Sequence, residues 1–110
     1  MPIQNLQPVD DLRNWLDDTT RQAPVLIDVR EPWETEICKI RDSISIPMNT
    51  IEDRYALLNP DVETVVICHH GARSMQVALF LERSGFKKLH NLAGGVDAWA
   101  RQIDPAMSVY

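Results

Sequence analysis

A cysteine followed by a short polar segment is the part of the sequence best suited to chemistry. Cys68 comes directly after residues 64–67, an apolar and β-branched run that is typical of a buried strand. Residues 73–85 then have the pattern of a helix that stops at a glycine. Free backbone N–H groups and the positive dipole end at a helix start stabilise a thiolate, which is the reactive form of cysteine. The sequence therefore predicts that Cys68 is a nucleophile.

The residues that follow this cysteine are expected to form a binding loop around its sulfur: His69, His70, Gly71, Ala72, Arg73 and Ser74. A backbone that wraps a small anion favours glycine, and a serine in the first helical turn offers its hydroxyl to the helix end. The two histidines either add positive charge near neutral pH or contribute only their backbone. Arg73 either faces the substrate or turns inward, and we favour pairing with a carboxylate such as Asp28.

Two charged residues at the end of another predicted strand are expected to support the loop. Residues 25–29 form a nearly continuous apolar run that Asp28 interrupts, and Arg30 follows. A buried carboxylate without donors or a cationic partner is costly. We therefore expect Asp28 and Arg30 to hold the neighbouring loop in place rather than to take part in the chemistry.

Strand and helix patterns alternate along the chain. Strands are expected at residues 3–6, 25–29, 43–47, 64–67 and 87–92, and helices at 9–20, from Pro32, from Asn49 or Thr50, at 73–85 and at 96–103. This alternation predicts an α/β/α three-layer fold with a mostly parallel sheet. In such sheets ligands bind beyond the carboxyl ends of the strands, where Cys68 lies. Residues 1–110 are expected to form one domain, with 104–110 as a tail.

The charge of the chain and its apolar runs narrow the classes of partner. The net charge of −5 argues against nucleic-acid binding, whereas residues 65–90 carry a net +3, which suits a small anionic substrate. No apolar run approaches the roughly 18 residues of a membrane span. The first residues lack the pattern of a signal peptide. Two cysteines are too few for a disulfide framework, so we expect reduced thiols and a cytoplasmic location.

Four segments together resemble the rhodanese-like sulfurtransferases of the single-domain type. They are residues 26–31 (LIDVRE), 44–47 (ISIP), 68–74 (CHHGARS) and 92–99 (LAGGVDAW). The resemblance implies a five-stranded sheet with helices on both faces. It also implies transfer of sulfane sulfur through a persulfide on Cys68, from a donor such as thiosulfate to cyanide, a thiol or a partner protein. It implies no metal and no organic cofactor.

Several alternatives remain open at this point. Four residues separate Cys68 from Arg73, whereas the phosphatases that share this fold have one more, so phosphatase and arsenate reductase activities are disfavoured. A persulfide carrier or a regulatory binding module with little thiosulfate turnover is the main alternative. A metal site made by Cys68, His69 and His70 is disfavoured, because adjacent residues do not easily point at one ion. Cys38 stands where the family usually has glycine, and is either a small half-buried residue or a resolving thiol.

Overall fold

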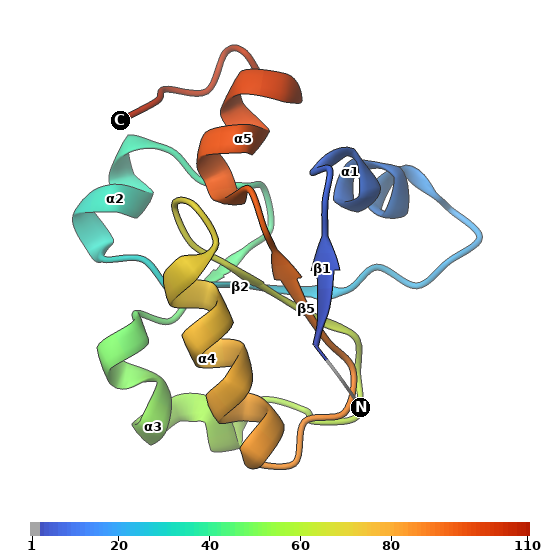
Figure 1. Ribbon diagram of the computed structural model, residues 1–110, viewed down its shortest axis with the longest axis vertical. Coiled ribbons are helices and arrows are strands. Elements are labelled where there is room, and N and C mark those ends of the chain that lie inside the picture. Colours follow the sequence, from blue (N-terminus) through green and yellow to red (C-terminus); the bar gives the residue numbers. More distant parts are fainter. Residues whose placement is uncertain (1–2) are drawn as a thin grey trace.

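The computed structural model describes residues 3–110 and contains a five-stranded, fully parallel sheet (Figure 1). Its strands are β1 (Gln4–Leu6), β2 (Val25–Asp28), β3 (Ile44–Ser45), β4 (Thr64–Ile67) and β5 (Leu89–Leu92), in the order β1-β5-β4-β2-β3. The helices are α1 (Asp10–Asp17), α2 (Pro32–Ile37), α3 (Ile51–Arg54), α4 (Ala72–Arg83) and α5 (Gly95–Gln102). The predicted α/β class and the parallel sheet are confirmed.

The sheet separates two hydrophobic cores. Neighbouring residues of β4 point to opposite faces, with Val66 in one core and Val65 in the other. The first core packs under α3 and α4, and the second packs under α1 and α5. All four residues of β4 are buried, as expected for a central strand with helices on both sides.

The structure corrects several predicted boundaries. The first helix ends at Asp17, three residues before the predicted end, because Asp18 is extended and its carboxylate accepts bonds from the backbone N–H and hydroxyl of Thr20. The strand predicted over 43–47 has two residues and pairs only with β2. Thr50 stands at the start of α3, but its hydroxyl donates to the Pro47 carbonyl and does not cap the helix.

The carboxyl ends of the strands face α2, the start of α4 and the start of α5. The last residues run from α5 toward α2, so the C-terminal segment lies at this end of the sheet (Figure 1). Residues 104–110, predicted as a tail, form no helix or strand, yet Tyr110 is only half-exposed and contacts the loop after β4. Across residues 3–110, no helix has the length and hydropathy needed to cross a membrane.

Candidate active site

The loop between β4 and α4 folds back over the sulfur of Cys68. The Gly71 backbone N–H donates to Cys68 Sγ at 3.0 Å, and the Ser74 hydroxyl lies 3.3 Å from the same atom. Both donors belong to the helix start: Gly71 precedes α4, and Ser74 is in its first turn. Hydrogen bonds of this kind stabilise negative charge on sulfur. The arrangement therefore matches the one expected for a reactive thiolate.

Gly71 adopts a backbone conformation that other residues rarely reach. Its φ of +106° is left-handed, and a β-carbon there would overlap the backbone carbonyl oxygen of Ala93. Asn91 of β5 holds the same region, since its side-chain N–H₂ donates to the Gly71 carbonyl at 3.2 Å and its oxygen accepts from the Ser74 hydroxyl. Asn91 thus fixes both groups that contact the sulfur.

The opposite side of the loop is held by the start of α5. The Val96 N–H donates to the Cys68 carbonyl at 2.9 Å, and the Asp97 N–H donates to the His69 carbonyl at 3.1 Å. Gly95 allows this approach, because its φ is +63° and a β-carbon would lie 2.5 Å from the Cys68 carbonyl oxygen. The predicted tight turn at residues 94–95 therefore also fixes the loop that follows β4.

The ion pairs around the loop differ from the prediction. Arg73 turns inward as expected, but its partner is Glu34 of α2 and not Asp28: the guanidinium donates to both carboxylate oxygens at 2.7 and 2.8 Å. Asp28 instead pairs with Arg30, at 2.9 Å from Nε and 2.7 Å from Nη2. Asp28 pairs with Arg30 because the two residues are close in sequence and the Arg30 backbone N–H also donates to the Asp28 carboxylate.

These contacts join three buried residues, Asp28, Arg30 and Glu34, to the partly exposed Arg73. Arg30 is 0% exposed and also donates to the carbonyls of Glu34 and Cys38, at 3.2 and 2.7 Å. The Arg73 guanidinium holds the pKa of Glu34 at about 2, and the same hydrogen bonds raise the pKa of Arg73. At Arg73, the positive charge that was expected to attract an anion is therefore balanced by the Glu34 carboxylate.

The C-terminal residue covers part of this network. Tyr110 Oη accepts a bond from Arg30 at 3.0 Å and donates to Glu34 at 2.8 Å, while its ring stacks on His69 with centroids 4.1 Å apart. Burial raises the pKa of Tyr110 to about 12 and lowers the pKa of His69 below its usual 6.5. Burial thereby favours the neutral form of His69, whereas the side chain of His70 is 66% exposed.

Cys38 lies at the end of α2, half-buried, with its sulfur 3.8 Å from Arg30 Nη1. Cys38 and Cys68 are both free thiols. The position of Cys38 against the Arg30 guanidinium agrees with the interpretation of a small packed residue.

Comparison with known proteins identifies the family. Residues 8–102 match the model of the rhodanese-like domain. The chain belongs to the rhodanese-like family. A rhodanese-like domain protein from Staphylococcus aureus has the same fold, with a TM-score of 0.80, 29% identity, and coverage of 100% of this chain and 99% of that one. The predicted resemblance and its five-stranded fold are thus confirmed.

Relatives of this rhodanese-like chain differ in length. The Arabidopsis thaliana rhodanese-like/PpiC domain-containing protein 12, chloroplastic, is 36% identical over 99% of this chain, which spans only 38% of that protein. Probable adenylyltransferase/sulfurtransferase MoeZ of Mycobacterium tuberculosis is 37% identical over 91% of this chain, which spans 26% of that protein. An Allochromatium vinosum protein named sulfurtransferase is 38% identical, with 76% of this chain and 78% of that protein covered.

Four residues of the site carried no predicted role: Glu34, Asn91, Asp97 and Tyr110. Glu34 had a signal, because it follows Pro32 in the first turn of α2 and its carboxylate accepts the Glu31 N–H at 2.8 Å, as in a capping box. Asn91 is one of two polar residues in a fully buried strand, which is a weaker signal. Tyr110 had none, since residues 104–110 lack any periodic pattern.

Proposed function

We propose that this chain is a sulfurtransferase that carries sulfane sulfur as a persulfide on Cys68. The observation that supports this most directly is the 3.0 Å contact from the Gly71 N–H to Cys68 Sγ at the start of α4. A thiolate held this way is a nucleophile whose charge the backbone stabilises before and after sulfur is bound. The residue as a whole is 1% exposed, which favours a small donor over a bulky one.

In the first step, the Cys68 thiolate attacks the outer sulfur of a donor such as thiosulfate. A new S–S bond forms on the cysteine, the S–S bond of thiosulfate breaks, and sulfite leaves with the electron pair. The persulfide keeps one negative charge, so the Gly71 N–H and the Ser74 hydroxyl remain useful donors after transfer.

In the second step, a nucleophilic acceptor attacks the terminal sulfur of the persulfide. Cyanide in an assay, or a thiol or partner protein in a cell, forms a bond to that sulfur, and the Cys68 thiolate leaves with its electron pair. The two half-reactions share one covalent intermediate, so we expect ping-pong kinetics. We further propose a reducing compartment such as the cytoplasm, on the ground that both thiols are free.

The test is a thiosulfate–cyanide assay together with mass spectrometry. The wild-type protein should release thiocyanate, and after thiosulfate alone the peptide with Cys68 should gain the mass of one sulfur atom. Cys68→Ser should lose both signals, because the hydroxyl is a far weaker nucleophile at neutral pH. Absence of a persulfide with every sulfane donor tested would overturn the proposal.

Cys38→Ala is the matched cysteine control. It should keep the persulfide and the thiocyanate signal, since the proposed cycle uses one thiol. Loss of turnover with a retained persulfide would instead identify Cys38 as a resolving thiol. A wild-type protein that forms the persulfide but turns over thiosulfate poorly would favour a carrier that hands sulfur to one dedicated acceptor.

A further inference from the structure

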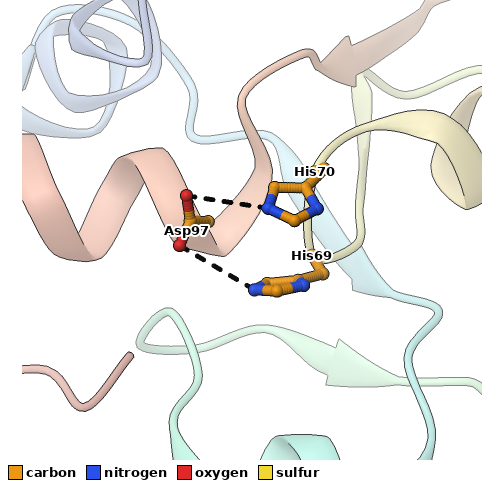
Figure 2. Close-up of side chains that lie close together, drawn as sticks. All are labelled: His69, His70 and Asp97. Atoms are coloured by element: carbon orange, nitrogen blue, oxygen red, sulfur yellow. Dashed lines mark ion pairs between the residues drawn. The ribbon is translucent and has the colours of Figure 1, made fainter. Parts of the chain in front are cut away.

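His69, His70 and Asp97 bring three potential metal ligands together beside the active-site loop. Figure 2 shows that both imidazole rings point toward the carboxylate of Asp97, which belongs to α5. His69 Nε2 is 3.8 Å from Asp97 Oδ1, and His70 Nε2 is 3.7 Å from Asp97 Oδ2. One ligand atom from each residue lies within 4.8 Å of the other two. We propose that these residues form a binding site for a divalent transition-metal ion of the zinc type.

The distances fit an ion placed between the three groups. Bonds of about 2.0–2.2 Å to nitrogen and oxygen in a tetrahedral site separate the ligand atoms by roughly 3.3–3.6 Å. The two observed His–Asp separations of 3.7 and 3.8 Å involve different oxygens of Asp97, and one ligand atom from each residue lies within 4.8 Å of the other two, so the ligand atoms must close by up to roughly 1.5 Å. Two imidazole nitrogens select zinc, copper or nickel over magnesium or calcium, which prefer oxygen. Three protein ligands leave a coordination position for water or a small anion.

The state of His69 Nε2 points to a missing partner. This nitrogen is buried and makes no hydrogen bond, because Asp97 lies too far away for one. A buried polar atom without a partner is costly. A metal ion between His69 and Asp97 would give this nitrogen a partner.

The backbone explains why adjacent histidines converge here, which was not expected from the sequence. The His69 carbonyl accepts the Asp97 N–H, so the loop and the carboxylate belong to one fixed unit. The His69 ring is held between two others, with centroids 3.9 Å from the His70 ring and 4.1 Å from the Tyr110 ring. Both imidazoles are therefore aligned toward Asp97 before any ion binds.

Arg101 is the group that competes for the carboxylate. Its Nε lies 3.1 and 3.2 Å from the two Asp97 oxygens, one turn further along α5. The Arg101 side chain is 62% exposed, and exposed ion pairs of this type are weak. The proposal therefore predicts that Arg101→Gln strengthens metal binding by a few-fold. If the Arg101–Asp97 pair had no connection with metal binding, the substitution would leave the affinity unchanged.

The experiment is calorimetric titration of the full chain with Zn²⁺ after Cys38→Ser and Cys68→Ser have removed both thiols. We expect one ion per chain. Adding His70→Gln should weaken binding at least tenfold, and this side chain is exposed enough that the fold does not depend on it. Asp97→Asn should act in the same direction. Asp61→Asn, at an exposed carboxylate, should leave the affinity unchanged.

Imidazole NMR signals of the same thiol-free protein give a second measurement. Zn²⁺ should shift the ring resonances of His69 and His70 and leave those of His90, which pairs with Glu63, in place. Zinc binding that is lost with the thiols, or that is unaffected by His70→Gln and Asp97→Asn, would overturn the proposal. Shifts confined to His90 would do the same.

Discussion

The Ser74 hydroxyl carries one proton but lies beside two acceptors, Cys68 Sγ and the side-chain oxygen of Asn91. The hydroxyl donates to Sγ when the sulfur is negatively charged, and to the Asn91 oxygen when the sulfur is neutral. The side-chain N–H₂ of Asn91 is meanwhile occupied by Gly71 and Asn5, which keeps its oxygen facing the serine. Ser74 is therefore a donor whose strength follows the charge on the sulfur.

At this scale we predict the effect of Ser74→Ala. One of the two donors to the sulfur disappears, so persulfide formation from thiosulfate should slow about 10- to 100-fold, as expected for a hydrogen bond to a charged group. The buried Asn91 oxygen loses its partner as well, which should cost about 1–3 kcal/mol of unfolding free energy. Stopped-flow measurement of the first half-reaction and denaturant unfolding would test the two effects.

Ser84→Ala is the control for that variant. Ser84 directly follows the far end of α4, and its hydroxyl donates to the Phe80 carbonyl. It should leave the rate of persulfide formation unchanged. An unchanged rate in Ser74→Ala would contradict the assignment of its hydroxyl as a donor to the reacting sulfur.

The sequence predicted an individual feature of the site only where the chemistry of a single residue was enough to indicate it. The strand–cysteine–helix pattern predicted the position of Cys68, and the need of a buried carboxylate predicted that Asp28 has a cationic partner. The prediction that Arg73 pairs with Asp28 was wrong, because sequence spacing does not rank Arg73 against Arg30 as its partner. The Glu34–Arg73 pair joins residues 39 positions apart, which no local pattern reveals.

Among the elements, α2 and α4 are linked by an ion pair that depends on pH. Glu34 is ionised down to about pH 2 in the folded protein, against a usual carboxyl pKa of 4.5. A carboxyl whose pKa is lowered by folding stabilises the fold fully above its unfolded value, and that stability is lost as the pH falls through the folded value. The contribution is therefore present at pH 5 and declines toward pH 2.

We accordingly predict that Glu34→Gln lowers the free energy of unfolding at pH 7 by on the order of 3 kcal/mol, and that the difference from wild type shrinks between pH 5 and pH 2. Urea unfolding across this pH range measures it. Glu36→Gln, on the exposed side of the same helix, should show little difference at any pH. A Glu34→Gln deficit that is constant down to pH 2 would refute the link.

Predicted elements agreed best with the structure where periodicity was strong. The central strand, β4, has the predicted bounds, 64–67. One element end differed because a side chain bonds its own backbone neighbours, as Asp18 does after α1. Such a bond depends on a single polar residue, so the pattern of hydrophobic residues does not predict where it ends a helix.

On the scale of the whole molecule, positive and negative side chains from distant parts of the sequence lie together at the site. The basic segment, residues 65–90, supplies Arg73, which pairs with Glu34, and the Tyr110 hydroxyl donates to Glu34 and accepts from Arg30. Local charge counted along the sequence therefore overstates the positive field at the loop. Backbone N–H groups remain the main source of attraction for an anion there.

Tyr110 gives a prediction at this scale, because it joins the chain end to the loop after β4. Burial lowers the pKa of His69, and the stacked Tyr110 ring covers that imidazole. Tyr110→Leu should therefore raise the pKa of His69 toward 6.5, followed by NMR titration of the ring signals. Tyr110→Phe keeps the stacked ring and should leave this pKa nearly unchanged while losing the bonds to Arg30 and Glu34. Equal pKa values in both variants would show that the ring does not shield His69.

The contact between α5 and the loop has a consequence for how the sequence can vary. A trans peptide directs its C=O and N–H in opposite directions, so binding the carbonyls of Cys68 and His69 to α5 turns the next two amides away from that helix. The orientation of these peptide planes is thus set by main-chain N–H groups 28 positions further along the chain, those of Val96 and Asp97. Changing the side chain at 69, 70 or 72 therefore leaves the orientation of these amides as it is. A β-carbon at position 95 would instead collide with the carbonyls of Cys68 and His69 and disturb that orientation.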